Sequence, residues 1–414
     1  MADEAASGRA AAGSRDVPLL FATRIARLFA YGFLSVVLVL YLGALGFRGP
    51  TTGLLLTATL LGDAVVTLWI TSQADRVGRR RMLLLGALLM TAGGAVFLLT
   101  REPWLMAIAA IVGVISPSGN EIGPFLAIEQ AALTERMPDR ERTRLFAWYN
   151  VAGSAATAVG ALAGGWLTSS LQHRGLAEVE SYRVVLAGYS LVGVLLAVLF
   201  AFLSPKVEVR TAEVPGVRRW LGLHRSRGIV ARLSALFALD AFAGGFILQS
   251  VVAYWFHTRF GATPATHGTL FFTANVLAAG SALLASSLAA RIGLVQTMVF
   301  THLPSNLLLM TVPWMPSLPL AMAMYLIRSS ISQMDVPTRQ SYTVAVVAPD
   351  ERAAASGVTA IARSIGAALA PWAGGAFLMT GAGAPFYLAG GLKVVYDLLL
   401  FRSFRTLRPP EERG

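Results

Sequence analysis

Long apolar stretches recur along this chain and are separated by short polar connections. A helix that crosses a bilayer needs about 20 mostly apolar residues, so each stretch predicts one membrane-spanning helix. The predicted spans are residues 18–43, 51–72, 82–100, 104–131, 145–171, 182–203, 229–257, 265–289, 294–312, 317–347, 353–380 and 385–401. The pattern therefore predicts an all-α membrane protein with twelve transmembrane helices, in which the short connections make successive helices antiparallel.

A longer polar segment divides the predicted spans into two groups of six. The expected order is a disordered cytoplasmic tail over 1–17, an N-terminal six-helix bundle over 18–203, a cytoplasmic linker over 204–228, a C-terminal six-helix bundle over 229–401 and a cytoplasmic tail over 402–414. The first sixteen residues contain acids and no apolar core, so they do not predict a cleavable signal peptide.

Composition and charge agree with a membrane location. Hydrophobic residues make up 55% of the chain and charged residues 14%, whereas soluble proteins have roughly 25% charged residues. The net charge of +12 does not indicate a nucleic-acid partner, because Lys and Arg recur in short runs between apolar stretches. With the N-terminus inside, 22 of them lie in cytoplasmic segments and five on the opposite side. This asymmetry predicts a multi-pass protein of the cytoplasmic (plasma or inner) membrane with both termini cytoplasmic.

The two halves also resemble each other in sequence, which indicates a duplicated bundle. The segment SQADRVGRRR from Ser72 matches SLAARIGLVQ from Ser287. Matching positions in order are Gly53 with Gly268, Arg76 with Arg291, Gly78 with Gly293, Pro138-Asp139 with Pro349-Asp350, and Gly164-Gly165 with Gly374-Gly375. Several matches at similar offsets favour two related six-helix halves over chance.

One loop carries a family resemblance. Residues Asp75-Arg76-Val77-Gly78-Arg79-Arg80-Arg81, between the second and third spans, resemble the G-x-x-x-D-R-x-G-R-R loop of the major facilitator superfamily, with Ser72 and Gln73 where a small residue is usual. Span five, with Gly160, Gly164 and Gly165, is similar to the G-P-x-x-G-G motif of drug/proton antiporters without its proline. Span eleven has Pro371, Gly374 and Gly375. Span four, however, lacks the Arg that these antiporters usually carry.

The resemblance covers nearly the whole chain. It implies two pseudo-symmetric six-helix bundles, a secondary transporter, and a loop that holds the two halves together on the cytoplasmic side, with span eleven as partner. Gly78 permits a tight turn, and Asp75 can face the positive N-terminal end of another helix. The alternative is that Arg79–Arg81 only determine topology. Glu129, nearer the cytoplasm, is an expected anchor of this loop.

Ionisable residues inside predicted spans are functional candidates, because each costs roughly 2.5–3.5 kcal/mol at the bilayer centre. Span four carries Asn120, Glu121, Phe125 and Glu129, the last three at a spacing that predicts one helical face. Span ten carries Arg328, Ser332, Asp335 and Arg339 at similar spacing. Pro124 and Pro337 follow the two central acids, and helix breaks at corresponding places in two halves indicate a binding site.

In the superfamily, spans one, four, seven and ten line the central cavity. We therefore predict Glu121 and Asp335 as the acids that bind substrate or a proton. No base stands at helical spacing from Glu121 on its own span, which favours a proton or substrate role for it. Asp335 has Arg339 and Arg328 on its own helix and is equally well explained by a structural ion pair.

Other charged residues leave alternatives open. Arg27 and Asp240 occupy matching places in spans one and seven, so they either face each other across the cavity or pair within their own halves. Asp63 in span two and Arg363 in span eleven either form a gate or are satisfied separately. Lys393 and Asp397 stand four residues apart, which predicts a pair on one helix.

These patterns predict a secondary active transporter that works by alternating access, with proton-coupled efflux of an organic or amphiphilic compound as the leading hypothesis. The alternatives are a proton-driven importer of an anionic metabolite, with Arg328, Arg339 or Arg27 as counter-charge, and a non-transporting membrane sensor. An enzyme is not expected, since the five histidines are scattered and no HExxH, GxSxG or GxxxxGK[ST] motif occurs. No cofactor or metal is expected, and the expected partners of a monomer are a small molecule, protons and the bilayer.

Overall fold

All regular structure in the described residues is helical. The computed structural model describes residues 2–121, 123–134, 139–208, 223–348, 351–377, 379–380 and 382–407. Its α-helices are α1 (Ala2–Ser35), α2 (Leu38–Ala44), α3 (Gly49–Val77), α4 (Arg79–Leu99), α5 (Pro103–Val112), α6 (Phe125–Thr134), α7 (Asp139–His173), α8 (Glu178–Ala201), α9 (Arg227–Gly245), α10 (Gln249–Phe260), α11 (Pro264–Ile292), α12 (Leu294–Thr311), α13 (Leu318–Ser329), α14 (Asp335–Ala345), α15 (Arg352–Gly374) and α16 (Ala384–Phe404). Short 3-10 turns lie at Pro205–Val207 and Val312–Trp314.

Four of the twelve predicted spans are interrupted. The first, fourth, seventh and tenth spans are the pairs α1/α2, α5/α6, α9/α10 and α13/α14, whereas each of the other eight is one α-helix. The two breaks predicted from prolines are present: α6 begins directly after Pro124, and Pro337 lies in the first turn of α14. Proline is well tolerated in a first helical turn, because its missing N–H has no partner there in any case.

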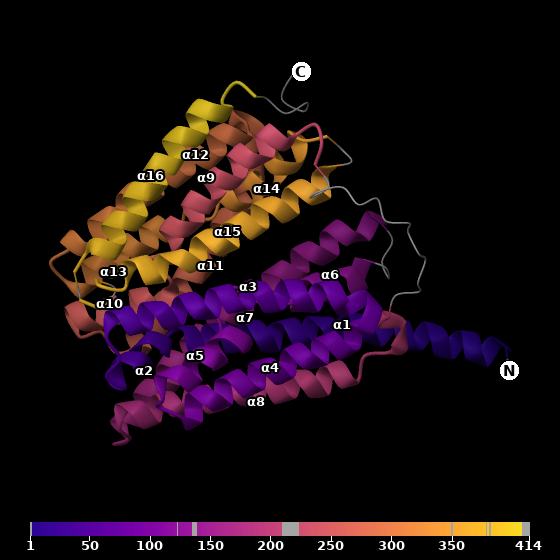
Figure 1. Ribbon diagram of the computed structural model, residues 1–414, viewed down its shortest axis with the longest axis horizontal. Helices are drawn as coiled ribbons and strands as arrows, with labels where there is room; N and C mark the ends of the chain where they lie inside the picture. Colours follow the sequence, from indigo (N-terminus) through magenta and orange to yellow (C-terminus); the bar gives the residue numbers. More distant parts are fainter. Residues whose placement is uncertain are drawn as a thin grey trace. The chain divides into compact units, whose positions relative to one another are not determined.

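The chain forms two compact units with matching internal packing. Unit 1 comprises residues 1–46, 61–213 and 263–272, and unit 2 comprises residues 47–60, 214–262 and 273–414. In unit 1, α1 packs against α7 and α4 against α8; in unit 2, α9 packs against α15 and α12 against α16 (Figure 1). The contact between spans one and five in unit 1 thus corresponds to the contact between spans seven and eleven in unit 2. In the same way, the contact between spans three and six corresponds to that between spans nine and twelve. The repeat inferred from sequence is a repeat of packing.

Glycines allow the closest of these helix contacts. A Cβ on Gly160 would lie 2.1 Å from the Phe29 carbonyl oxygen, and a Cβ on Gly164 would lie 2.4 Å from that of Phe33, so α7 and α1 touch backbone to backbone. The repeated glycines pack in the same way in each unit. Gly268 lies against Gly165 in unit 1, and Gly53 lies against the Pro371 carbonyl and Gly375 in unit 2. Gly374 is buried beside them.

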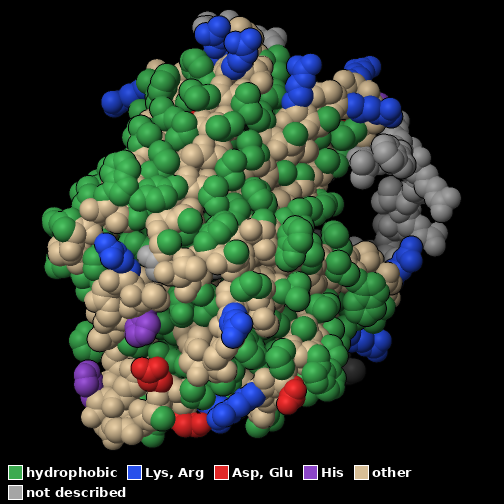
Figure 2. Space-filling model, turned by 60° about the vertical axis from the view of Figure 1, so that its left-hand side comes forward, with side chains coloured by type: hydrophobic (Ala, Val, Ile, Leu, Met, Phe, Trp, Pro, Cys, Tyr) green, Lys and Arg blue, Asp and Glu red, His purple; other side chains and the backbone are tan. Residues whose placement is uncertain are grey.

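The surface of the helices suits a bilayer. Eight of the described helical segments are long and apolar enough to cross one, and Pro103–Val112 and Leu318–Ser329 are shorter apolar helices. Large apolar side chains such as Leu54, Leu99 and Leu191 are more than half exposed. Hydrophobic side chains cover most of the face in Figure 2, and charged ones gather toward its ends. Such a surface is stable in lipid rather than in water.

The polar ends of the N-terminal half differ in part from expectation. Helix α1 begins at Ala2 and so includes the stretch predicted as a disordered tail. Asp16, buried at the end of that stretch, accepts hydrogen bonds from the Ser204 backbone N–H at 3.0 Å and the Ser204 hydroxyl at 2.6 Å. Of the predicted linker 204–228, residues 209–222 lie outside the described residues, as do Pro138, Pro349 and Asp350 of the proposed repeat.

Glu351 fixes the segment that leads into α9, outside the predicted spans. Burial raises the pKa of its carboxyl group, but hydrogen bonds from the Ser226 side chain and from the backbone N–H groups of His224, Arg225 and Ser226 outweigh burial and bring the pKa from 4.5 to about 2. The charged carboxylate accepts from the Arg225 N–H at 2.8 Å and the Ser226 N–H at 2.9 Å. The carboxylate therefore fixes the backbone turn that immediately precedes α9.

The hydrogen bonds to Glu351 lead to a prediction for acid stability. Because the folded pKa of Glu351 is depressed, its stabilisation is fully present above pH 4.5 and is lost as pH falls toward about 2. We expect Glu351→Gln to lower the thermal unfolding temperature at neutral pH. The difference from wild type should shrink between pH 4.5 and about 2, measured on purified protein in detergent. A difference that stays constant over this range would show that the carboxylate charge is not responsible.

Candidate functional site

Unit 1 holds a buried cluster of two bases and two acids around Arg27. The Arg27 guanidinium, on α1, donates to both oxygens of Glu129 on α6, at 2.9 and 2.7 Å, and through Nε to Glu121 at 2.9 Å. Arg24, one turn earlier on α1, donates to the other Glu121 oxygen at 2.9 Å. The two-pronged pairing of Arg27 with Glu129 is the strongest geometry for such a pair.

Glu129 is the structural centre of this cluster, and Glu121 lies at its edge. Glu129 is completely buried and also accepts hydrogen bonds from the Thr23 hydroxyl at 2.8 Å and the Tyr149 hydroxyl at 2.5 Å. The Glu121 side chain keeps 15% of its surface exposed. Of the two acids, Glu121 is therefore the one that water or a ligand can reach.

The contacts of span four differ from those expected from its sequence. Glu121 does not share a helical face with Glu129, because α6 begins only at Phe125; the two acids meet at Arg27 instead. Glu121 has basic partners after all, which come from span one rather than from its own span. Among the described residues, the Glu129 side chain contacts Thr23, Arg27 and Tyr149 rather than the Asp75–Arg81 loop. Asn120 is exposed and lies outside the cluster.

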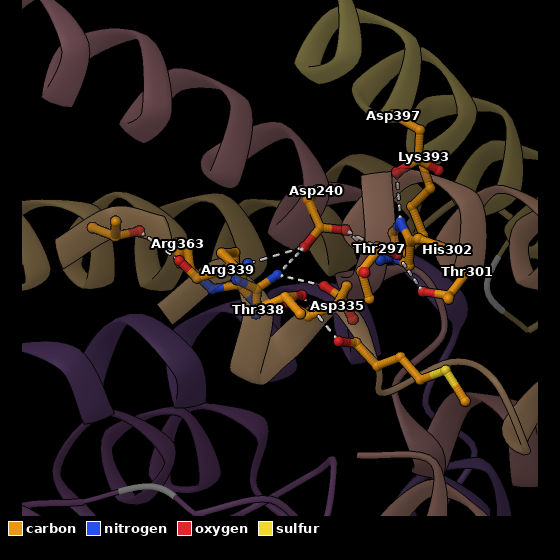
Figure 3. A network of polar contacts seen from close by, with 12 residues as sticks. Asp240, Thr297, Thr301, His302, Asp335, Thr338, Arg339, Arg363, Lys393 and Asp397 are labelled. Atoms are coloured by element: carbon orange, nitrogen blue, oxygen red, sulfur yellow. Dashed lines mark hydrogen bonds and ion pairs between the residues drawn. The ribbon is translucent and has the colours of Figure 1, made fainter. Parts of the chain in front are cut away.

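Unit 2 holds the counterpart cluster, centred on Asp240 of α9 (Figure 3). One Asp240 oxygen accepts from the Lys393 ammonium at 2.6 Å, and the other accepts from Arg363 at 2.9 Å and Arg339 at 3.3 Å. His302 Nε2 lies 3.8 Å from the first oxygen. A single carboxylate thus holds together bases from α14, α15 and α16.

Two further carboxylates complete this network (Figure 3). Asp335 accepts from Arg339 at 2.8 Å, so the predicted pair on one helix is confirmed. Asp397 is bound by His302 Nδ1 at 2.8 Å and by the Asn306 amide at 3.0 Å, both on α12. The predicted Lys393–Asp397 pair is wrong, because Lys393 reaches Asp240 instead. Tertiary partners here prevail over a spacing that would favour a pair on an isolated helix.

The two clusters are related by the repeat, but acid and base are exchanged at matching positions. In unit 1 a base on span one binds acids on span four, and in unit 2 an acid on span seven binds a base on span ten. Arg27 and Asp240, which occupy matching places, are therefore each satisfied inside their own unit. The Arg363 guanidinium pairs with Asp240, so the partner proposed for it as a gate, Asp63, is not needed to satisfy it.

A polar cavity opens beside the unit 2 network. Its volume is about 580 Å³, and α9, α14 and α15 line it. The polar lining residues are Arg339, Gln340, Thr343, Ser356, Thr359, Arg363 and Ser364. Arg363 keeps 32% of its side chain exposed. The cavity therefore offers guanidinium and hydroxyl groups to a polar ligand.

Within the described residues, Arg328 and the signature loop form no ion pair with either cluster. The Arg328 guanidinium packs 5.7 Å from the centre of the Tyr325 ring. In the loop, Gly78 has φ +114°, which favours glycine, and the backbone N–H groups of Arg79 and Arg80 donate to Glu208 at 2.6 and 3.3 Å. Arg76 is exposed, and the Asp75 side chain lies outside the described residues. A carboxylate from the chain after α8 thus caps α4.

Sequence reasoning missed several members of these clusters. His302 and Asn306 stand four residues apart in an apolar span, which is itself a signal for a shared polar partner. Tyr149 gave no comparable signal, since most aromatic residues in such proteins serve packing or lie at the interface. Glu208 lies in the linker, where an acid is unremarkable.

Two six-span units with corresponding helix breaks and buried ion pairs define a membrane transporter fold. The sequence profile of the Major Facilitator Superfamily matches residues 20–332 and 238–414. The chain belongs to the major facilitator superfamily, and the fold predicted from its sequence is confirmed. The family indicates a transporter of small molecules rather than an enzyme.

Known relatives and solved structures agree with this assignment. The uncharacterized membrane protein YJR124C of Saccharomyces cerevisiae is 27% identical over 428 residues, which cover 94% of each chain. Multidrug resistance protein MdtH of Shigella dysenteriae is 29% identical over 142 residues, or 34% of this chain and 31% of MdtH. A bacterial homologue of the human lysosomal transporter Spinster, in an inward-facing conformation, has a TM-score of 0.75 at 16% identity and covers 95% of this chain and 97% of its own. A D-xylose-proton symporter has a TM-score of 0.70, also at 16% identity, with 93% and 97% coverage.

Proposed function

We propose that this protein is a proton-coupled secondary transporter that exports an organic or amphiphilic compound by alternating access. It acts as a monomer in the cytoplasmic membrane, with both termini in the cytoplasm. The export direction is supported by the partial similarity to MdtH and by the glycine motifs of spans five and eleven. The membrane and its orientation are supported by the distribution of Lys and Arg.

One observation carries the proposal: carboxylates at the helix breaks of spans four and ten are held by arginines. Glu121 lies in the break between α5 and α6 and pairs with Arg24 and Arg27 of α1. Asp335 begins α14 after the break in span ten and pairs with Arg339. Non-helical backbone inside a membrane protein is tolerated where it lines a cavity or is buried in protein. Carboxylates at helix breaks can change ion-pair partners as access alternates. The protonation of a carboxylate can then be coupled to the conformation of the transporter.

The coupling role of Glu121 is testable by transport. In proteoliposomes, candidate solutes are screened while lumenal pH is recorded, with wild type beside Glu121→Gln. We expect substrate-dependent proton movement in wild type and its loss in Glu121→Gln, because the neutral side chain no longer holds the two arginines. Glu180→Gln is the matched control. Glu180 is half exposed, and within the described residues its ion-pair partner is Arg183, which is itself partly exposed. Proton movement unchanged in Glu121→Gln would remove Glu121 from the coupling site.

The second candidate is a proton-driven importer of an anionic metabolite. The cavity of unit 2 favours it, because Arg339 and Arg363 line that cavity together with hydroxyl groups. Arginine is well suited to bind carboxylate or phosphate groups. The two functions differ in a simple phenotype: loss of an exporter sensitises cells to compounds, whereas loss of an importer blocks growth on a nutrient. Neither phenotype is expected of a membrane sensor.

A further inference from the structure

The acids inside the predicted spans differ in one respect, which is whether they have a basic partner. The spans contain Asp63, Glu121, Glu129, Asp240, Asp335 and Asp397. Five of them pair with Arg, Lys or His at 2.6–2.9 Å. Within the described ranges, no ion pair reaches Asp63. Its Oδ1 atom is buried and has no hydrogen-bond partner among these residues.

The surroundings of Asp63 hold this carboxyl group in place but supply no positive charge. A Cβ on the preceding Gly62 would lie 2.1 Å from the Ile111 carbonyl oxygen, so α3 is pressed against the end of α5. The groups that act on Asp63 are the Gly123 backbone, the Thr67 side chain and the carboxylate of Glu121. Two tyrosines, Tyr31 of α1 and Tyr189 of α8, complete its electrostatic surroundings. None of these neighbours is a base, and one is an acid.

Charge accounting separates Asp63 from the other five acids. An ionised carboxylate inside a protein is costly unless a cation or hydrogen bonds compensate it. Adding a proton to any of the five paired acids removes the negative charge that its basic partner contacts, and so weakens at least one ion pair of a cluster. Adding a proton to Asp63 instead removes a negative charge that has no basic partner. It also removes the repulsion between the Asp63 and Glu121 carboxylates. Asp63 is thus the acid at which a proton can come and go without dismantling a cluster.

We propose that Asp63 is the residue that takes up and releases the coupled proton. The inference deepens the proposed proton-coupled transport and rests on it. Glu121, which pairs with Arg24 and Arg27, lies near enough for its charge to act on Asp63. A proton on Asp63 strengthens the hold of Glu121 on these arginines, and its release weakens that hold. Asp63 carries the proton, and the Glu121 cluster transmits its presence to α1.

The first test needs no substrate. Infrared difference spectra of the purified full-length protein are recorded between acidic and alkaline pH, where a protonated carboxyl group gives a C=O stretching band. We expect this band in wild type, in Glu121→Gln and in the exposed control Glu180→Gln, and its loss in Asp63→Asn. Asp63→Glu should restore a band at a shifted frequency. A band that persists unchanged in folded Asp63→Asn, as judged by its thermal unfolding, would overturn the proposal.

The second test separates this proposal from the proposed function. In proteoliposomes, wild type should move protons with a transported solute, and Asp63→Asn should lose proton movement while still exchanging labelled for unlabelled solute. Proton-free transport by wild type would refute proton coupling itself, whatever the infrared result. Proton movement by wild type that continues in Asp63→Asn would refute only the assignment to Asp63. Movement that follows Na⁺ rather than pH would also overturn the assignment of a proton.

Discussion

Replacing Arg27 by Gln is expected to lower the free energy of unfolding by about 3–5 kcal/mol, the cost of removing one partner from a buried ion pair. Arg27 has no exposed surface, and neither has the Glu129 carboxylate that it binds through two hydrogen bonds. Without the guanidinium, Glu129 keeps only the hydroxyl groups of Thr23 and Tyr149. Thermal or denaturant unfolding of the purified protein in detergent measures the loss.

A double substitution shows whether the stranded charge is the cause. Arg27→Gln combined with Glu129→Gln removes both charges, so it should be more stable than Arg27→Gln alone even though it has lost more native groups. Glu180→Gln, which breaks an exposed pair, should change stability by less than about 1 kcal/mol. A double variant as unstable as the single one would mean that packing of the Arg27 side chain, rather than charge, holds α1 in place.

Features that depend on residues close together in the sequence could be predicted, whereas contacts between different spans could not. Span lengths, the prolines that begin α6 and α14, and the glycines of the repeat are local features, so the sequence predicts the fold well. Asp335 and Arg339 were predicted as a pair because they are four residues apart on one helix. The remaining partners come from other spans, and nothing in the local spacing indicates them.

Glu121 and Lys393 illustrate this limit. No base stands at helical spacing from Glu121 on its own span, and its partners are about one hundred residues away in the sequence. Lys393 had a suitable acid one turn away and yet binds Asp240. Within a membrane, each charged group needs a partner that compensates for its lost hydration. Which partner is within reach depends on how the helices pack in the assembled bundle.

The charge reversal between the units has a mechanical consequence. Unit 1 divides two acids between two bases, so each charge there has one or two partners. Unit 2 concentrates Arg339, Arg363 and Lys393 on Asp240. Removal of one charge from unit 1 leaves at most one group without an ion-pair partner, whereas neutralising Asp240 affects bases on three helices at once.

Asp240→Asn is therefore expected to be the most damaging single substitution in unit 2, with a loss of about 3–5 kcal/mol in unfolding free energy. Most of this loss is expected to come from the unpaired ammonium of Lys393, because only 10% of that side chain is exposed and Asp240 is the carboxylate it contacts. Arg363 is 32% exposed and water can compensate it in part, while Arg339 retains Asp335. Unfolding measurements in detergent, made beside transport assays, report the loss of stability and of activity separately.

Asp335→Asn is the matched comparison, since it removes a buried carboxylate from the same network but leaves every base a partner. Arg339 would still contact Asp240, so the loss of stability should be clearly smaller than for Asp240→Asn. Asp240→Asn combined with Lys393→Met should recover part of the loss, because the buried ammonium is then gone as well. If Asp335→Asn proves as damaging as Asp240→Asn, the network does not depend on the shared carboxylate, and the position of Asp335 at the start of α14 must contribute the larger part.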